Sequence, residues 1–173
     1  MDSIDIIDLF VKFGLGAIFG GSAVYFTIKD RLDKQKKYNA GRRVNLLEDV
    51  AQHVGKVSHV FGKYATLVME VGPNAGRMSV KQERELEELN NDLVEVYQEI
   101  AIAESKLLLL GEKKLDKALK IYTGKMAQFR KQFYPGRYTS TEDLNTNKKE
   151  TSAMREQFYD ILSERYDQII QQW

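Results

Sequence analysis

The chain has no cysteine and only two prolines, Pro73 and Pro135, among its 173 residues. Without cysteine it cannot hold a disulfide framework, a thiolate zinc site, an iron–sulfur cluster or a cysteine nucleophile. Because proline is the strongest helix breaker, its scarcity permits long uninterrupted helices. The two prolines therefore predict turns at the places where they stand.

Recognisable catalytic motifs are also lacking. The sequence contains no G-x-S-x-G elbow, no Walker loop and no dinucleotide-binding glycine motif after a strand. Its two histidines, His53 and His59, fall on different faces of one helix, and the Glu-x-x-His pair of metal-binding bundles is absent. We therefore predict no enzyme activity, with no catalytic, cofactor-binding or metal-binding residue.

A strong charge of either sign is missing too. The chain has 26 basic and 25 acidic residues, for a formal net charge of +1, which argues against a dedicated nucleic-acid-binding protein. Hydrophobic residues make up 43% of the chain, which is enough for a packed core.

The most prominent feature that is present is the apolar stretch Leu9–Ile28, in which Lys12 is the only charged residue. A helix of about 20 residues crosses the hydrocarbon core of a membrane, so we predict a single transmembrane anchor. A cleaved signal peptide would begin with basic residues, whereas Asp2, Asp5 and Asp8 precede this stretch. A buried glycine-rich helix of a soluble protein is the other alternative.

A basic juxtamembrane segment follows the anchor at once. Its seven cationic residues are Lys29, Arg31, Lys34, Lys36, Lys37, Arg42 and Arg43. By the positive-inside rule, the N-terminus would lie outside and everything after the anchor in the cytoplasm, which we expect at a bacterial inner membrane.

Small residues fall on one side of the predicted anchor. Gly16 and Gly20, and likewise Ala17 and Gly21, have the small-xxx-small spacing that lets membrane helices pack closely. We predict that these four residues pack against another membrane helix. Alternatively, they reflect only the general frequency of glycine in membrane spans.

The rest of the chain predicts an all-α fold. Residues 38–41 predict a break, which separates an anchor at 1–37 from a cytoplasmic bundle at 38–173. Apolar residues then step by three and four, in coiled-coil-like seams, over residues 47–71, 86–110 and 115–133, and the last two seams lie in helices predicted at 79–110 and 112–133. A last helix is predicted at 151–172, after a loop at 138–150. Short connections imply an antiparallel bundle of about four helices.

The second and third predicted helices carry opposite charge. Residues 79–106 hold eight acidic and three basic side chains, whereas residues 112–137 hold eight basic and two acidic ones. This contrast predicts attraction between neighbouring helices or between copies of the protein. A possible interaction face comprises Lys113, Lys117, Lys120, Lys131 and the terminal Trp173; binding of anionic lipid, binding of nucleic acid and plain solvation are the alternatives.

The predicted function is a non-enzymatic scaffold or adaptor anchored in membrane lipid. Its cytoplasmic helices would engage a protein partner or form a homo-oligomer. One alternative is an oligomeric, holin-like or toxin-like membrane effector, which the glycines of the anchor favour. A second is a membrane-tethered nucleic-acid-binding protein, which the basic third helix favours.

Overall fold

The computed structural model describes residues 3–72, 78–133 and 140–171, with side chains described from residue 29 onward. All the regular structure in these ranges is helical, and none of them contains a strand. The chain divides into two compact units, residues 1–42 and residues 43–172. The second unit is a helical bundle, so the all-α fold class is confirmed.

The first helix, α1 (Ser3–Val71), contains 69 residues. The predicted break at residues 38–41 is wrong, because α1 runs through them. Asn39 and Gly41 each lower helix propensity by no more than about 1 kcal/mol, which is too little to interrupt a helix. Within the part of the chain whose side chains are described, no helix is apolar over a long enough stretch to cross a membrane. The side chains of the predicted anchor, Leu9–Ile28, lie outside that part.

The second half of α1 supplies the central seam of the bundle. Every apolar position predicted from the heptad pattern is buried: Leu47, Val50, Val54, Val57, Phe61, Tyr64, Val68 and Val71. Val and the aromatic residues lower helix propensity, so packing of this seam has to stabilise the helix. The helix ends immediately before Gly72-Pro73, as predicted.

The second predicted helix is divided into α2 (Val80–Val96) and α3 (Gln98–Leu110). Ser79 caps α2, since its side chain accepts from the backbone N–H of Gln82, whose own side chain accepts from the Ser79 backbone N–H. At Tyr97 the backbone N–H bonds to the carbonyl of Val94 at 3.3 Å, three residues back rather than four. This tightened turn separates the two helices.

The fourth helix, α4 (Lys113–Gln132), follows a two-residue connection, Gly111-Glu112. Gly111 has φ 72°, the left-handed conformation that glycine adopts without steric cost at the end of a helix. All six predicted seam positions are buried: Leu115, Leu119, Tyr122, Met126, Phe129 and Phe133.

The last helix, α5 (Thr141–Ile170), begins ten residues before the predicted start. The predicted loop is therefore wrong over residues 141–150. Ser140 caps the helix by accepting from the backbone N–H of Asp143 at 3.1 Å. Thr151 occupies a buried seam position between Leu144 and Phe158, and its hydroxyl bonds to the Asn147 carbonyl. This polar residue in the seam concealed the first third of the helix.

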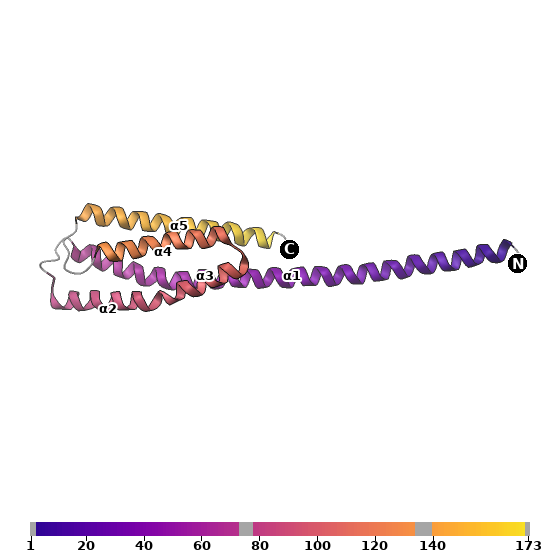
Figure 1. Cartoon of the computed structure of the whole chain (residues 1–173), viewed down its shortest axis with the longest axis horizontal. Helices are drawn as coiled ribbons and strands as arrows, with labels where there is room; N and C mark the ends of the chain where they lie inside the picture. The colour runs from indigo at the N-terminus through magenta and orange to yellow at the C-terminus, as the bar shows by residue number, and fades with distance from the viewer. Residues whose placement is uncertain (1–2, 73–77, 134–139, 172–173) are drawn as a thin grey trace. The chain divides into compact units, whose positions relative to one another are not determined.

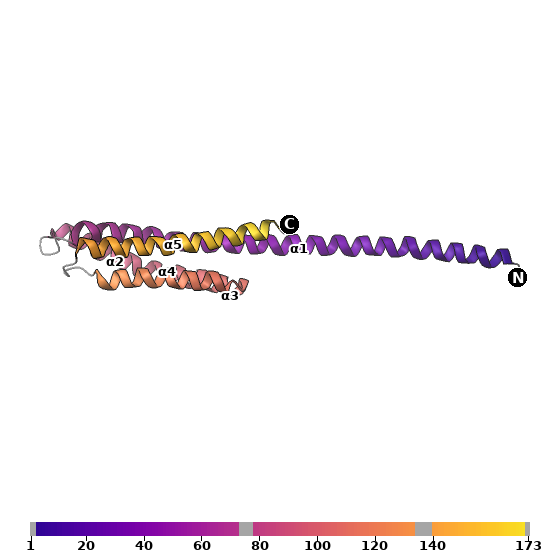
Figure 2. The same ribbon diagram turned by 90° about the horizontal axis from the view of Figure 1, so that it is seen from above.

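Within the bundle, the pairs α1–α2, α3–α4 and α4–α5 run antiparallel, whereas α3 continues in the direction of α2 (Figures 1 and 2). α1 contacts α4 through an edge-to-face pair of Phe61 and Phe129, whose ring centroids are 5.4 Å apart. The Tyr64 hydroxyl donates to the Phe133 carbonyl at 3.1 Å, so this buried polar group is satisfied. α5 follows α4 and packs against both α4 and α1.

Two close junctions fix the ends of the bundle. At one end, Glu112 Oε1 accepts from Arg165 Nε of α5 at 2.6 Å and from an Arg43 guanidinium nitrogen of α1 at 3.3 Å. At the other, a Cβ added to Gly72 would lie 2.9 Å from a methyl carbon of Leu144. Glycine at position 72 thus lets α5 approach the end of α1.

Candidate interaction surfaces

The exposed face of α2 is acidic, as the sequence predicts. Its exposed carboxylates are Glu83, Glu85, Glu87, Glu88, Asp92 and Glu95. Only one of them forms an ion pair with another described residue, Glu88 with Arg84 of the same helix at 3.6 Å. The attraction predicted between this face and the lysines of the next helix forms no ion pair within the described residues.

Some lysines of α4 instead form ion pairs within α4 or with α5. Lys120 Nζ lies 2.7 Å from Asp116 of its own helix, and this hydrogen bond raises the pKa of Lys120. Lys125 pairs with Glu150 of α5 at 2.7 Å. Lys113, Lys117 and Lys131 of the predicted interaction face are exposed and form no ion pair in the described part of the chain. Trp173 lies outside the described residues.

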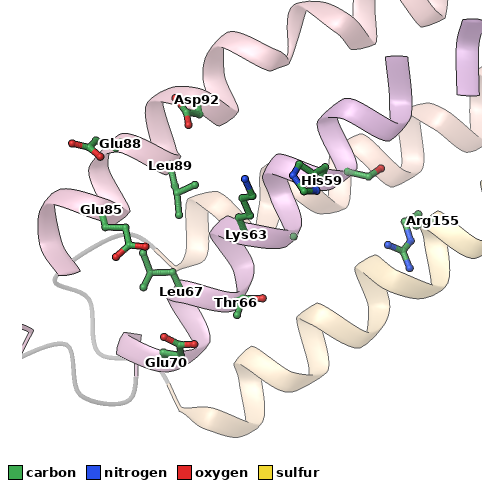
Figure 3. A pocket seen from close by; sticks show the side chains of 12 residues that line it. His59, Lys63, Thr66, Leu67, Glu70, Glu85, Glu88, Leu89, Asp92 and Arg155 are labelled. Carbon is green, nitrogen blue, oxygen red and sulfur yellow. The ribbon is translucent and has the colours of Figure 1, made fainter. Parts of the chain in front are cut away.

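A groove of about 830 Å³ lies between α1 and α2 (Figure 3). α2 lines it with Glu85, Glu88, Leu89 and Asp92, and α5 contributes Arg155. α1 supplies the remaining lining residues, which are Ser58, His59, Gly62, Lys63, Thr66, Leu67 and Glu70. The groove thus draws residues from three helices that are distant in sequence.

Charges of both signs line this groove without neutralising one another. Lys63 of α1 and Arg155 of α5 are exposed and form no ion pair among the described residues. Glu85 and Asp92 on α2 are likewise unpaired within that part of the chain. Four carboxylates and two permanent cations line the groove, so its electrostatic balance is acidic.

The groove is open because α2 covers α1 incompletely. Over its 17 residues, α2 buries only Leu86 and Leu93. Leu89, a predicted seam residue, is half-buried and lines the groove instead. On α1, a Cβ added to Gly62 would meet no atom within 4 Å. The space therefore results from missing side-chain volume on both helices.

A polar cluster joins α1 to α3 beside this region. His53 Nδ1 lies 2.5 Å from Glu99 Oε2, and Lys56 Nζ donates to the same oxygen at 3.0 Å. Lys106 Nζ donates to Asp49 at 2.7 Å and lies 3.2 Å from His53 Nε2. A lysine ammonium can only donate, so these contacts assign the imidazole hydrogen of neutral His53 to Nδ1.

The same hydrogen bonds stabilise the charged forms of the two carboxylates. The bond from His53, followed by that from Lys56, lowers the pKa of Glu99. The bond from Lys106 lowers the pKa of Asp49. Each hydrogen-bond donor to these carboxylates lies on the facing helix, so we interpret the cluster as a set of contacts that hold α1 and α3 together. Among the described residues there is no group of three or more His, Asp or Glu side chains arranged to bind a metal ion.

The leucine run at the end of α3 is only partly covered. Leu107 is buried, whereas Leu108 and Leu109 are 62% and 80% exposed. Arg43 donates to the Leu110 carbonyl at 3.4 Å as well as to Glu112, so it takes part in bundle packing. The two exposed leucines form an apolar tip at the α3–α4 turn.

The cations that precede the bundle are exposed. They are Lys29, Arg31, Lys34, Lys36, Lys37 and Arg42. Lys34 alone among them has an ion-pair partner in the described residues, Asp30 at 2.8 Å. Membrane-helix packing is predicted for Gly16, Ala17, Gly20 and Gly21, which lie in the part of α1 whose surroundings are not described.

The acidic face was predicted from the sequence, but the groove was not. Lys63 and Arg155 carry no signal in their own segments, because only the packing of the helices places both in the lining of one groove. Comparison of the chain with protein-family models, with curated proteins and with solved structures found no match.

Proposed function

We propose that the chain is a non-enzymatic scaffold, anchored in a membrane by Leu9–Ile28, whose cytoplasmic bundle binds a partner protein. The apolar length of that stretch and the cations that follow it support the anchor and its orientation. The bundle would concentrate the partner at the membrane surface.

The unpaired acidic face of α2 is the observation that carries this proposal. Five of its six exposed carboxylates have no ion-pair partner among the described residues, although lysines are abundant on α4. Charged surfaces of one sign speed the encounter with an oppositely charged partner and select against like-charged ones. A face that the chain itself does not neutralise is suited to that use.

Co-purification from native membranes tests the scaffold. The full chain, extracted with a mild detergent, should retain a specific partner at physiological salt. The variant Glu83→Gln/Glu85→Gln/Glu87→Gln/Asp92→Asn should lose that partner. The matched variant Lys113→Gln/Lys117→Gln/Lys120→Gln/Lys131→Gln should keep it. A partner retained equally by both variants, or none in the wild type, would contradict the proposal.

Alkaline carbonate extraction tests the anchor separately. A spanning helix stays in the lipid when high pH strips peripheral proteins, so the full chain should remain in the membrane pellet. Its complete release into the supernatant would show that Leu9–Ile28 does not span the membrane, whatever the bundle binds.

A further inference from the structure

We propose that the groove between α1 and α2 binds a basic amphipathic helix of the partner protein. The proposal rests on the scaffold function and names the site and the chemistry of its occupant. It follows from three properties of the groove, namely its length, its charge and its small apolar floor.

The length of the groove matches a helical segment. Its lining on α1 runs from Ser58 to Glu70, which is about 18 Å of helix at the usual rise. Its volume of about 830 Å³ is enough for several side chains. The groove would therefore take the side chains from one face of about three helical turns, with the occupant lying along α1 and α2.

The charge of the groove selects a basic occupant. Glu85, Glu88 and Asp92 lie on the α2 wall, spaced by three and four residues, so they form one stripe along the helix. Lysines or arginines with the same spacing on a facing helix would meet them. Lys63 and Arg155 add a smaller basic region, which favours an acidic residue at the opposite edge of the occupant.

The apolar part of the lining gives the occupant an anchor. Leu89 of α2 is half-buried, Leu67 of α1 also lines the groove, and a Cβ added to Gly62 of the same lining would meet no atom within 4 Å. One or two leucine-sized side chains would cover this floor. Apolar anchors enclosed by charged contacts are the usual energetic centre of an interface.

Binding of designed helical peptides tests the groove directly. The probe is a fluorescein-labelled peptide of 18 residues with leucines on one face and lysines on the flanks; its counterpart carries glutamates in place of the lysines. Fluorescence anisotropy with the full chain in nanodiscs of neutral lipid should show binding of the lysine peptide. Binding should weaken as salt is raised, and the glutamate peptide should bind at least about tenfold more weakly.

Two double variants with the same charge change locate the site. Glu85→Gln/Asp92→Asn removes two carboxylates inside the groove, and Glu83→Gln/Glu87→Gln removes two outside it on the same helix. The first should weaken binding about tenfold, because two contact charges are lost, and the second less than about threefold. Equal weakening by both variants would overturn the groove in favour of non-specific attraction to α2.

A second pair of variants tests the groove without changing any charge. A Cβ added to Gly62 or to Gly124 of α4 would meet no atom within 4 Å, so both positions can accept a larger side chain. Gly62→Leu should fill the groove and reduce binding at least tenfold, whereas Gly124→Leu should leave it unchanged. Undiminished binding to Gly62→Leu would overturn the proposal.

The failure of this inference can be told apart from failure of the scaffold. If native partner capture persists in Gly62→Leu, the groove assignment is wrong and the scaffold stands. If the lysine peptide binds as expected but native membranes yield no partner, the scaffold fails and the groove stands. If wild-type protein sediments as a dimer and Gly62→Leu as a monomer, the occupant is a second copy and the partner helix is refuted.

Discussion

α2 and α4 lie in the same bundle and have similar lengths, yet they are built differently. α4 buries five of its 20 residues in one continuous seam, whereas α2 buries two of 17. Three of the six α4 lysines, Lys114, Lys120 and Lys125, pair with carboxylates of α4 or α5, whereas Glu88 is the only exposed carboxylate of α2 with an ion-pair partner among the described residues. α4 is thus built for stability, and α2 as the wall of an open groove.

The difference shows that a heptad pattern does not by itself indicate a buried helix. Both segments step by three and four residues, but the steps of α2 include Leu89 and Val96, which remain half-buried. The number of seam residues that become buried depends on how closely the neighbouring helix approaches.

The largest contrast concerns the apolar side chains of the two helices. Phe129 of α4 is fully buried and packs against Phe61 and Phe133, so Phe129→Ala should lower the free energy of unfolding by about 3–5 kcal/mol. Leu89→Ala on α2 should cost less than about 1 kcal/mol, because Leu89 is half-exposed. Guanidinium unfolding of the full chain in detergent, followed by circular dichroism, measures both. Equal costs would refute the contrast.

Two tyrosine hydroxyls make the next contrast. Tyr122 of α4 donates to Ser58 Oγ at 2.9 Å, so Tyr122→Phe should lower the free energy of unfolding by about 1 kcal/mol. The Tyr97 hydroxyl, at the end of α2, is buried without a hydrogen-bond partner in the described residues, and burial raises its pKa to about 12. Tyr97→Phe should be neutral or stabilise by up to about 1 kcal/mol. A larger loss of unfolding free energy for Tyr97→Phe than for Tyr122→Phe in the same assay would contradict the assigned contacts.

The two open glycines should respond alike although they lie on different surfaces. Gly62→Ala in the groove and Gly124→Ala on α4 should each raise the free energy of unfolding by about 0.4–1 kcal/mol, because alanine favours the helix and each site has room for a Cβ. The melting temperature of each variant measures this effect. Destabilisation by Gly62→Ala alone would mean that the groove is narrower than described.

The smallest effect is expected from acid. The pKa values of Asp49 and Glu99 are lowered in the folded chain from ordinary values of 3.8 and 4.5. Their stabilising contribution is therefore complete above those ordinary values and is lost as the pH falls through the lowered ones. Between pH 5 and about pH 3, Asp49→Asn/Glu99→Gln should lose less stability than the wild type. The control is Glu83→Gln/Glu87→Gln, which removes two carboxylates that have no ion-pair partner among the described residues. Its loss of stability in acid should equal that of the wild type.

Much of the fold could be predicted because two of the heptad seams, in α1 and over residues 115–133, consist entirely of buried residues. All eight predicted positions in α1 are buried, as are the five predicted in α4 and Phe133 just after it. The start of α5 was missed because Thr151 is polar and satisfies its hydroxyl within its own helix, although Ser140 with the acidic residues after it had the sequence of a helix start. The interruption at Tyr97 has no sequence signature, since neither glycine nor proline is near it.

The groove could not be predicted from the sequence. It depends on how far α2 stands from α1, and no residue pattern encodes that distance. The face of α2 was recognised as acidic, but the opposing Lys63 and Arg155 are 92 positions apart in the chain. Only the packed bundle brings them to one place.

The junction at Glu112 has a consequence for the alignment of the helices. A seam that repeats every seven residues looks the same after a shift of seven, so it permits helices to slide past one another by two turns. Glu112 receives both Arg43 and Arg165, and no other carboxylate lies seven residues before or after it. A slipped α1 or α5 would leave at least one guanidinium without this acceptor. The carboxylate of Glu112 thus distinguishes the native helix alignment from alignments shifted by seven residues, in which the apolar seams would match equally well.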